Sequence, residues 1–277
     1  DPELKNIQKN VRLYENFNNT ADGRIKVWFA PHAPYTCPPE YVEKIVEAAK
    51  SCNAGIHVHL AETLDEQRQI AEGYGKTPTE YLNDLGVFEL PTLAAHSVYL
   101  NDSDIAILKE HNVGIAHNPS SNLKLASGIA NIPKYLQAGL NVGIGTDGCS
   151  SNNTLNMFKE MTICSFVQKV NAMDPTVLPA EEILRLATIG GAKALRWDDE
   201  IGTLEVGKKA DLILVDIDKP HFAPWNNPVS DLVYSAQGSD VKTTIVNGKL
   251  LMKDYEVLTL DVERIMAETE RIARNVL

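Results

Sequence analysis

Residues 55–63 read Gly-Ile-His-Val-His-Leu-Ala-Glu-Thr. The first six residues have the length and apolar character of a buried strand, in which alternate residues share a face. His57 and His59 therefore lie on one face, and Glu62 follows just beyond the strand end. A neutral imidazole beside a carboxylate suits a divalent metal and a proton carrier. Buried, hydrogen-bonded histidines are the alternative, and it is stronger for His57 than for His59 with Glu62.

Strands and helices alternate on both sides of this stretch. We expect strands at 25–30, 55–60, 92–97, 113–117 and 140–145. Segments with a helical spacing of apolar residues lie between and after them, at 41–49, 65–72, 79–85, 104–111, 129–138, 154–170 and 179–195. Five strand–helix units in succession indicate parallel strands joined by right-handed crossovers.

A polar side chain ends or follows each expected strand. These residues are His32, His59, His96, His117 and Asp147. A barrel gathers the carboxyl ends of its strands around one mouth, whereas an open doubly wound sheet would spread them along a line. The pattern therefore favours a (β/α) barrel. An open-sheet nucleotide-binding enzyme is a weaker alternative, because no glycine-rich phosphate-binding motif follows any strand.

Each of these polar positions also has a structural alternative. Asp147 lies between glycines after an apolar strand, where a turn or helix cap is possible. His96 has apolar neighbours and could be a satisfied core histidine. The loop 117–122 is either a substrate loop or a series of Asx and Ser turns. Prolines on both sides of His32 indicate a rigid loop from which it can reach a substrate.

The sequence after residue 195 has a different pattern of apolar and turn residues. Short strands are expected at 201–204, 211–215 and 243–246, separated by Gly and Asn turns, which indicates antiparallel β structure. A helix is expected over 260–277. Its apolar face comprises Val262, Ile265, Met266, Ile272, Ala273 and Val276.

The composition excludes some classes of protein. Of 277 residues, 44% are hydrophobic and 23% are charged, which is typical of a globular chain. The net charge of −11 argues against binding to nucleic acid or to an anionic membrane. No apolar run reaches the length of about 18 residues that a transmembrane helix needs. The four cysteines include no C-x-x-C pair and are expected to be reduced thiols in a cytoplasmic protein.

Six motifs carry a resemblance to a known family. They are PHAPYTC (31–37), HVHLAET (57–63), AAHSVYL (94–100), HNPSSNLKLASGIA (117–130), GTDGCSSNNTLNMFKEM (145–161) and GTLEVGKKADLILVD (202–216). The chain resembles the amidohydrolase superfamily, and within it the 5′-methylthioadenosine/S-adenosylhomocysteine deaminases. The resemblance implies a metal-dependent hydrolase on a (β/α)8 barrel with a small β-sandwich. The implied reaction is deamination of an adenine nucleoside, which releases ammonia and the inosine analogue.

The resemblance also implies a role for each matching residue. His59 and Asp147 match metal ligands, and His96 matches the histidine that orients the water activated by the metal. Glu62 matches the proton carrier beside the substrate ring, and His32 matches a substrate-contacting histidine. Zinc is the first expectation for one divalent ion, with iron, manganese or nickel as alternatives. A small-molecule nucleoside partner and a homo-oligomer are also expected.

One family feature has no counterpart in the sequence. The family carries a further H-x-H pair of ligands on its first strand, and this chain matches only strands four to eight. We therefore assign 1–195 to the C-terminal part of the barrel, 196–258 to a β-sandwich portion and 259–277 to a C-terminal helix. We expect that the chain is truncated or that the missing part is a separate chain.

Two alternative functions remain open at this point. The nearest is another hydrolase of the same superfamily, such as a guanine deaminase or a triazine chlorohydrolase. The other is a metal-free relative that acts as an assembly subunit. The joint presence of His59, Glu62, His96 and Asp147 argues against a metal-free relative.

Overall fold

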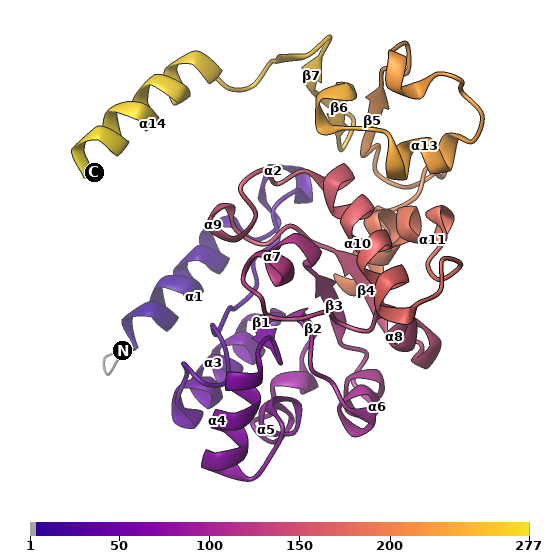
Figure 1. The fold of residues 1–277 in the computed structure, drawn as a ribbon. Coiled ribbons are helices and arrows are strands. Elements are labelled where there is room, and N and C mark those ends of the chain that lie inside the picture. Colours follow the sequence, from indigo (N-terminus) through magenta and orange to yellow (C-terminus); the bar gives the residue numbers. More distant parts are fainter. Residues whose placement is uncertain (1–3, 277) are drawn as a thin grey trace.

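A parallel sheet lies at the centre of the protein in the computed structural model, which describes residues 4–276 (Figure 1). Its strands lie side by side in chain order: β1 (Ile56–Leu60), β2 (Thr92–His96), β3 (Gly114–His117) and β4 (Asn141–Ile144). All three pairings are parallel, so the carboxyl ends of the four strands lie at the same edge. This confirms the predicted parallel arrangement and places the strand-end side chains together.

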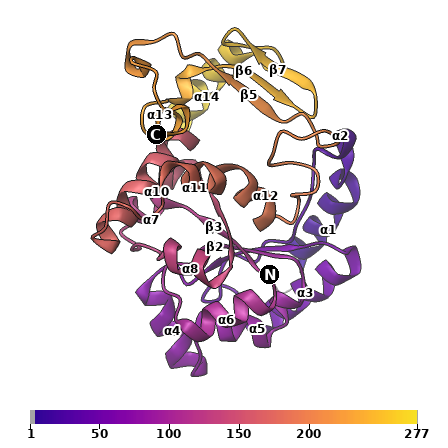
Figure 2. The ribbon, with the colours of Figure 1, turned by 90° about the vertical axis from the view of Figure 1, so that its right-hand side faces the viewer.

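Helices connect these strands and cover the sheet (Figures 1 and 2). The helices before and between the strands are α1 (Lys5–Phe17), α2 (Thr20–Gly23), α3 (Pro39–Cys52), α4 (Leu64–Tyr74), α5 (Pro78–Asp84), α6 (Asp102–Glu110), α7 (Pro119–Lys124) and α8 (Ile132–Ala138). Those after β4 are α9 (Cys149–Asn152), α10 (Met157–Ala172), α11 (Ala180–Arg185), α12 (Gly191–Ala194), α13 (Pro228–Tyr234) and α14 (Val262–Val276). Buried aliphatic and aromatic side chains from strands and helices form one core, which includes Phe29, Ile56, Leu60, Ile115, Tyr135 and Ile183.

The predicted strand at 25–30 is wrong over most of its length. Only Phe29 forms a bridge to β1, opposite Ile56. The side chain of Asn18 accepts a hydrogen bond from the Val27 N–H at 3.0 Å, so this donor does not enter a ladder. Pro31 has no N–H and ends the pairing on the other side. His32 still lies beside β1, because its carbonyl accepts the His59 N–H at 3.0 Å.

A second, antiparallel sheet follows the helical region. It comprises β5 (Leu212–Val215), β6 (Val241–Val246), β7 (Lys249–Lys253) and β8 (Glu256–Val257), which confirms the predicted antiparallel texture. The predicted strand at 201–204 is wrong. There the Ile201 N–H donates to the Trp197 carbonyl at 3.1 Å, and Gly202 turns the chain at a φ of +96°.

The expected barrel and sandwich are only partly present in the fold. Within residues 4–276 the parallel sheet has four strands in the order β1-β2-β3-β4, and the antiparallel sheet is single. The structure thus shows a mixed α/β fold rather than a closed barrel with a two-sheet sandwich.

The C-terminal helix was predicted from its apolar spacing and is confirmed as α14, although Leu277 lies outside the described residues. None of its residues is buried, and its apolar side chains Val262, Ile265, Met266, Ile272 and Val276 are exposed. The predicted helix at 179–195 is interrupted by a π-helical segment at Leu186–Gly190. Helix α1 was not predicted, although Ile7 is buried in the core and Val11 and Tyr14 pack against it.

Within residues 4–276, no helix combines the length and apolar composition that crossing a bilayer requires.

Candidate active site

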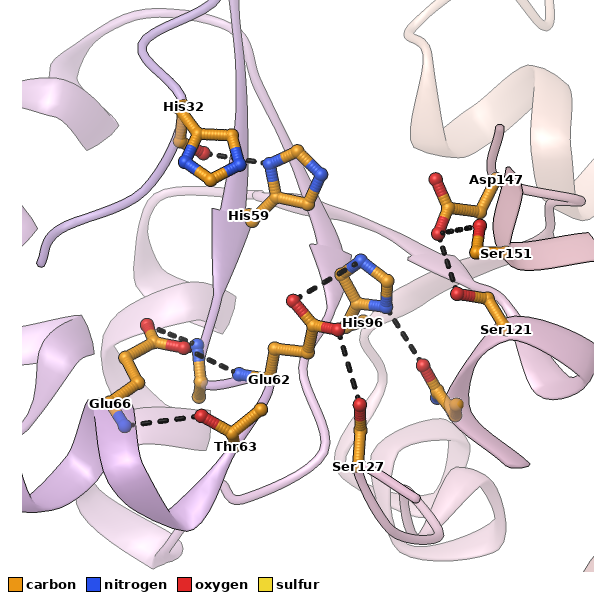
Figure 3. A network of polar contacts seen from close by, with 12 residues as sticks. His32, His59, Glu62, Thr63, Glu66, His96, Ser121, Ser127, Asp147 and Ser151 are labelled. Carbon is orange, nitrogen blue, oxygen red and sulfur yellow. Dashed lines mark hydrogen bonds and ion pairs between the residues drawn. The ribbon is translucent and has the colours of Figure 1, made fainter. Parts of the chain in front are cut away.

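Four of the five side chains predicted from the strand ends, those of His32, His59, His96 and Asp147, lie near one another at the carboxyl edge of the parallel sheet (Figure 3). The ring of His59 lies 4.8 Å from that of His32 and 5.3 Å from that of His96, measured between centroids. Glu62 Oε2 lies 3.8 Å from His96 Nε2. The structure therefore brings together residues that are far apart in the sequence, from three successive segments of the fold.

His59 is held in one tautomer. It lies on β1 opposite Ala95, and its Nδ1 donates a hydrogen bond to the His32 carbonyl at 2.7 Å. A carbonyl only accepts, so the ring proton is on Nδ1 and Nε2 keeps its lone pair. Histidines that bind metals are commonly oriented in this way by a backbone carbonyl.

His96 ends β2 in a left-handed backbone conformation, with a φ of +70°. Its side chain is almost fully buried, and Nδ1 donates to Asn122 Oδ1 at 2.8 Å. This contact leaves Nε2 facing the carboxylate of Glu62. The buried His96 is therefore satisfied on one side only, and its second nitrogen points into the site.

Glu62 projects from the turn after β1 toward His96 (Figure 3). The Ser127 hydroxyl donates to Glu62 Oε1 at 3.1 Å. Because Ser127 contacts Oε1 and His96 faces Oε2, the two oxygens have different environments. Oε2 is the oxygen directed toward His96.

Asp147 lies three residues beyond β4, with a φ of +60°. Ser121 and Ser151 both donate to Oδ2, at 2.5 and 2.7 Å, and the Gly148 N–H donates to Oδ1 at 2.6 Å. Burial acts to raise the pKa of Asp147, but these hydrogen bonds outweigh it and lower the pKa below its ordinary value. Asp147 is thus an ionised, firmly oriented carboxylate at neutral pH.

His32 lies on the far side of His59 from His96. Its Nδ1 is 2.8 Å from the Thr36 hydroxyl. Burial and the nearby ring of His59 lower the pKa of His32, which keeps the imidazole neutral at neutral pH. A neutral ring beside an open site can donate or accept a hydrogen bond from a ligand.

The other two histidines of the sequence motifs are placed differently. His57 is more than a third exposed and lines a cavity of about 740 Å³ together with Trp28 and Leu93. His117 is buried at the end of β3, and burial lowers its pKa to about 3. Neither ring nitrogen of His117 has a hydrogen-bond partner within residues 4–276. His117 is therefore a neutral core residue rather than part of the open site.

Several residues that support the site were not singled out from the sequence. They are Glu66, Ser121, Asn122, Ser127 and Ser151. Ser121 and Asn122 belong to the polar loop that was expected to be a substrate loop or a series of turns. The structure shows that this loop orients Asp147 and His96 instead of only turning the chain.

The donor set fits part of a divalent metal site. His59 Nε2 and the Asp147 carboxylate are an imidazole and a carboxylate ligand of the kind that zinc and similar ions take. Within residues 4–276, no group of three or more His, Cys, Asp or Glu side chains is arranged to hold a metal ion. A catalytic zinc site normally uses three protein ligands. His59 and Asp147 have the donor types of two of these three ligands.

The chain is similar to proteins of known family. The sequence profile of the amidohydrolase family matches residues 1–251. The 5-methylthioadenosine/S-adenosylhomocysteine deaminase of Caldanaerobacter subterraneus subsp. tengcongensis is 52% identical over 271 residues, which is 98% of this chain and 63% of that protein.

Solved structures that are similar to this one include two with bound zinc. An adenosine deaminase from Xanthomonas campestris with bound zinc has a TM-score of 0.92 and 34% identity, over 97% of this chain and 61% of that chain. Atrazine chlorohydrolase from Arthrobacter aurescens, complexed with zinc, has a TM-score of 0.87 and 27% identity, over 96% and 59% of the two chains. This chain thus spans about three fifths of the length of the proteins that it matches. The profile match over most of the sequence shows that the chain belongs to the amidohydrolase family.

Proposed function

We propose that this chain carries the later strands and much of the active site of a metal-dependent adenine nucleoside deaminase. The favoured substrates are 5′-methylthioadenosine and S-adenosylhomocysteine, with ammonia and the inosine analogue as products. The observation that carries the proposal is the convergence of His59, Glu62, His96 and Asp147 at one sheet edge. The 52% identity to a 5-methylthioadenosine/S-adenosylhomocysteine deaminase supports the choice of substrate.

The architecture follows from the same proposal. The four parallel strands are the later part of a (β/α)8 barrel, within residues 1–195. Residues 196–258 are a β-sandwich portion, and 259–277 are a C-terminal helix. We further propose a homo-oligomer in the cytoplasm, with no role in binding nucleic acid or membranes.

His59 and Asp147 would hold the metal, with zinc as the first choice because two similar structures contain it. When bound, the ion makes water a strong nucleophile near neutral pH. His59 contributes the lone pair of Nε2, which its hydrogen bond to the His32 carbonyl leaves available. Asp147 contributes a carboxylate that is ionised at neutral pH and fixed by two serine hydroxyls.

The proton transfers are assigned to three side chains. Glu62 carries a proton on Oε2 and delivers it to the purine ring nitrogen next to C6, which makes C6 electrophilic. Asp147 accepts a proton from the attacking water and passes it to the departing ammonia. His96 Nε2 orients the water and stabilises the charge that develops on its oxygen. General acid–base steps of this kind each contribute about 10²–10⁴-fold.

His32 is assigned to substrate binding. It stands across His59 from His96, on a loop whose prolines restrict its movement. Its neutral ring can hydrogen-bond a nucleoside without adding charge to the site.

The Glu62→Gln variant tests the assignment of the proton carrier. It should lower deamination by about 10²–10⁴-fold, because an amide cannot deliver a proton to the ring nitrogen. Its metal content should equal that of the parent, because Glu62 is not a ligand in this scheme. Ammonia release and elemental analysis of the protein, expressed from its complete reading frame, measure both. Deamination at the parental rate would reject the role of Glu62.

A second candidate function is another hydrolysis within the same family. The structural similarity to atrazine chlorohydrolase, with a TM-score of 0.87, supports this second candidate. Such an enzyme would share the metal residues and differ in the loops around them. Turnover of a triazine or of guanine in preference to adenine nucleosides would favour this candidate. Metal content near zero would favour a non-catalytic assembly subunit.

A further inference from the structure

A second carboxylate, Glu66, lies behind Glu62 and is only 1% exposed. It is the third residue of α4, and both of its oxygens accept backbone hydrogen bonds (Figure 3). Oε1 accepts the Ala61 N–H at 2.8 Å, and Oε2 accepts the Glu62 N–H at 2.7 Å. Glu66 therefore binds the backbone of the two residues that end the strand and begin the turn.

The turn held by Glu66 has an unfavourable backbone conformation. Ala61 has a φ of +50°, which lies in the left-handed region. This conformation is energetically unfavourable for any residue that has a Cβ atom. On its other side, the Ala61 carbonyl accepts the N–H groups of Val98 and Tyr99, both at 3.0 Å. Those residues belong to the loop that follows His96. The turn is thus held by hydrogen bonds to α4 on one side and to the loop after β2 on the other. Glu62 lies in this turn, and His96 directly precedes that loop.

Capping of α4 accounts for only one of the backbone contacts of this carboxylate, the one with the N–H of the N-cap residue Thr63. The Thr63 hydroxyl already caps the helix by accepting the Glu66 N–H at 3.1 Å. The pKa of Glu66 depends on its burial, on backbone N–H groups and on the nearby Glu62 carboxylate, rather than on a cation. Burial raises the pKa of Glu66 to about 7, against the effect of its hydrogen bonds. Burying a carboxylate without a neighbouring cation costs free energy. The contacts of Glu66 with the Ala61 and Glu62 N–H groups therefore need another explanation.

We propose that Glu66 is a positioning residue for Glu62: it fixes the backbone turn so that the Glu62 carboxylate stays directed at His96 Nε2 and the substrate ring. This inference rests on the proposed function, because it concerns the residue assigned there as proton carrier. Glu66 itself touches no reacting atom. Its effect is on the placement of Glu62, for which a shift of about 1 Å can cost about 10²-fold in rate.

The Glu66→Gln variant removes one acceptor while keeping the shape of the side chain. An amide has one acceptor oxygen, so its NH₂ group would face either the Ala61 or the Glu62 N–H. We expect kcat to fall by about 10–100-fold with KM changed by less than about threefold, since misplacing Glu62 affects the transition state more than substrate binding. Glu66→Asp keeps the charge but is one methylene shorter, and it tests the same point if the Gln variant does not fold.

A double-mutant cycle shows whether Glu66 acts through Glu62. In the Glu62→Gln background, Glu66→Gln should change the residual turnover by less than about twofold, because the group that Glu66 positions no longer works. An equal loss in both backgrounds would overturn the proposal, and so would an unchanged kcat in the single variant.

Asp104 provides a matched control. It is also a buried carboxylate at the third position of a helix, α6, and accepts the Asn101 N–H at 3.0 Å, but its hydrogen-bond partners are Thr77 and Asn101 rather than residues of the turn at Glu62. Asp104→Asn should lower the melting temperature and leave kcat unchanged. A loss of kcat in this control equal to that in Glu66→Gln would show a general effect of disturbing buried helix caps.

Hydrogen exchange separates failure of this inference from failure of the proposed function. The Ala61 and Glu62 amides should exchange faster in Glu66→Gln than in the parent, while the Ser97 amide, which donates to the Leu60 carbonyl at 2.9 Å, should be unchanged. This readout needs no turnover. If the parent deaminates no adenine nucleoside, the proposed function fails, and exchange alone decides whether Glu66 fixes the turn. Unchanged exchange at both amides would overturn the inference.

Discussion

The serine hydroxyls that contact Asp147 determine its charge state. Ser121 and Ser151 both donate to Oδ2, and these bonds help to lower the pKa against the effect of burial. The Ser121→Ala variant should therefore raise the pKa of Asp147, because a carboxylate that loses a donor is less favoured. Titration of the Asp147 carboxyl by NMR in metal-free protein measures the change. Ser103→Ala on α6 is the control, and an unmoved titration in Ser121→Ala would contradict the assignment.

His117 should make the protein sensitive to acid. Burial lowers its pKa to about 3 in the folded state, from an ordinary value of 6.5. Between these values the unfolded chain binds a proton that the folded chain does not, so stability falls as the pH drops below about 6.5. His117→Leu should flatten the dependence of melting temperature on pH from 6.5 to 4. Parallel curves for parent and His117→Leu would contradict the prediction.

At the residue scale, the sequence predicted which side chains meet but not what holds them. His59, His96 and Asp147 could be predicted because strand alternation and strand ends place them at one edge. Ser127 and Glu66 could not. Ser127 contacts Glu62 from 65 residues away, and the contact depends on a loop whose path no periodicity encodes. Glu66 resembled an ordinary first-turn acid of a helix.

At the scale of elements, close packing depends on glycines. A Cβ on Gly114 of β3 would lie 2.0 Å from the Ala194 carbonyl oxygen of α12. Gly114→Ala should therefore lower the free energy of unfolding by about 1–3 kcal/mol through overpacking. Gly73 on α4 has open space around its Cβ position, so Gly73→Ala should raise it by about 0.5–1 kcal/mol. Urea unfolding measures both, and equal effects would contradict this account of the strand–helix contact.

The parallel strands were predicted well because each is an apolar run framed by turns and helices. The segment 25–30 has the same apolar texture but forms only the bridge at Phe29. The Val27 N–H donates to the Asn18 side chain, and Pro31 has no N–H to donate. The hydrophobicity of the segment reveals neither of these effects. For the same reason the turn at Ile201 was mistaken for a strand.

At the scale of the whole molecule, the proposed function depends on the similarity of this chain to longer proteins. The chain matches about three fifths of the deaminase of Caldanaerobacter subterraneus, and it contains no counterpart of the H-x-H ligand pair that the resemblance implies. The net charge of −11 fits a small neutral substrate better than a polyanion. The proposed function therefore has to be tested on the protein from its complete reading frame, loaded with a divalent metal.

The most direct test is ammonia release from a panel of 5′-methylthioadenosine, S-adenosylhomocysteine, guanine and a triazine, with parent and Glu62→Gln proteins of equal metal content. The account predicts turnover of the adenine nucleosides by the parent and a loss of about 10²–10⁴-fold in the variant. It would be contradicted by a metal-loaded parent that releases no ammonia from either adenine nucleoside, or that prefers guanine or the triazine.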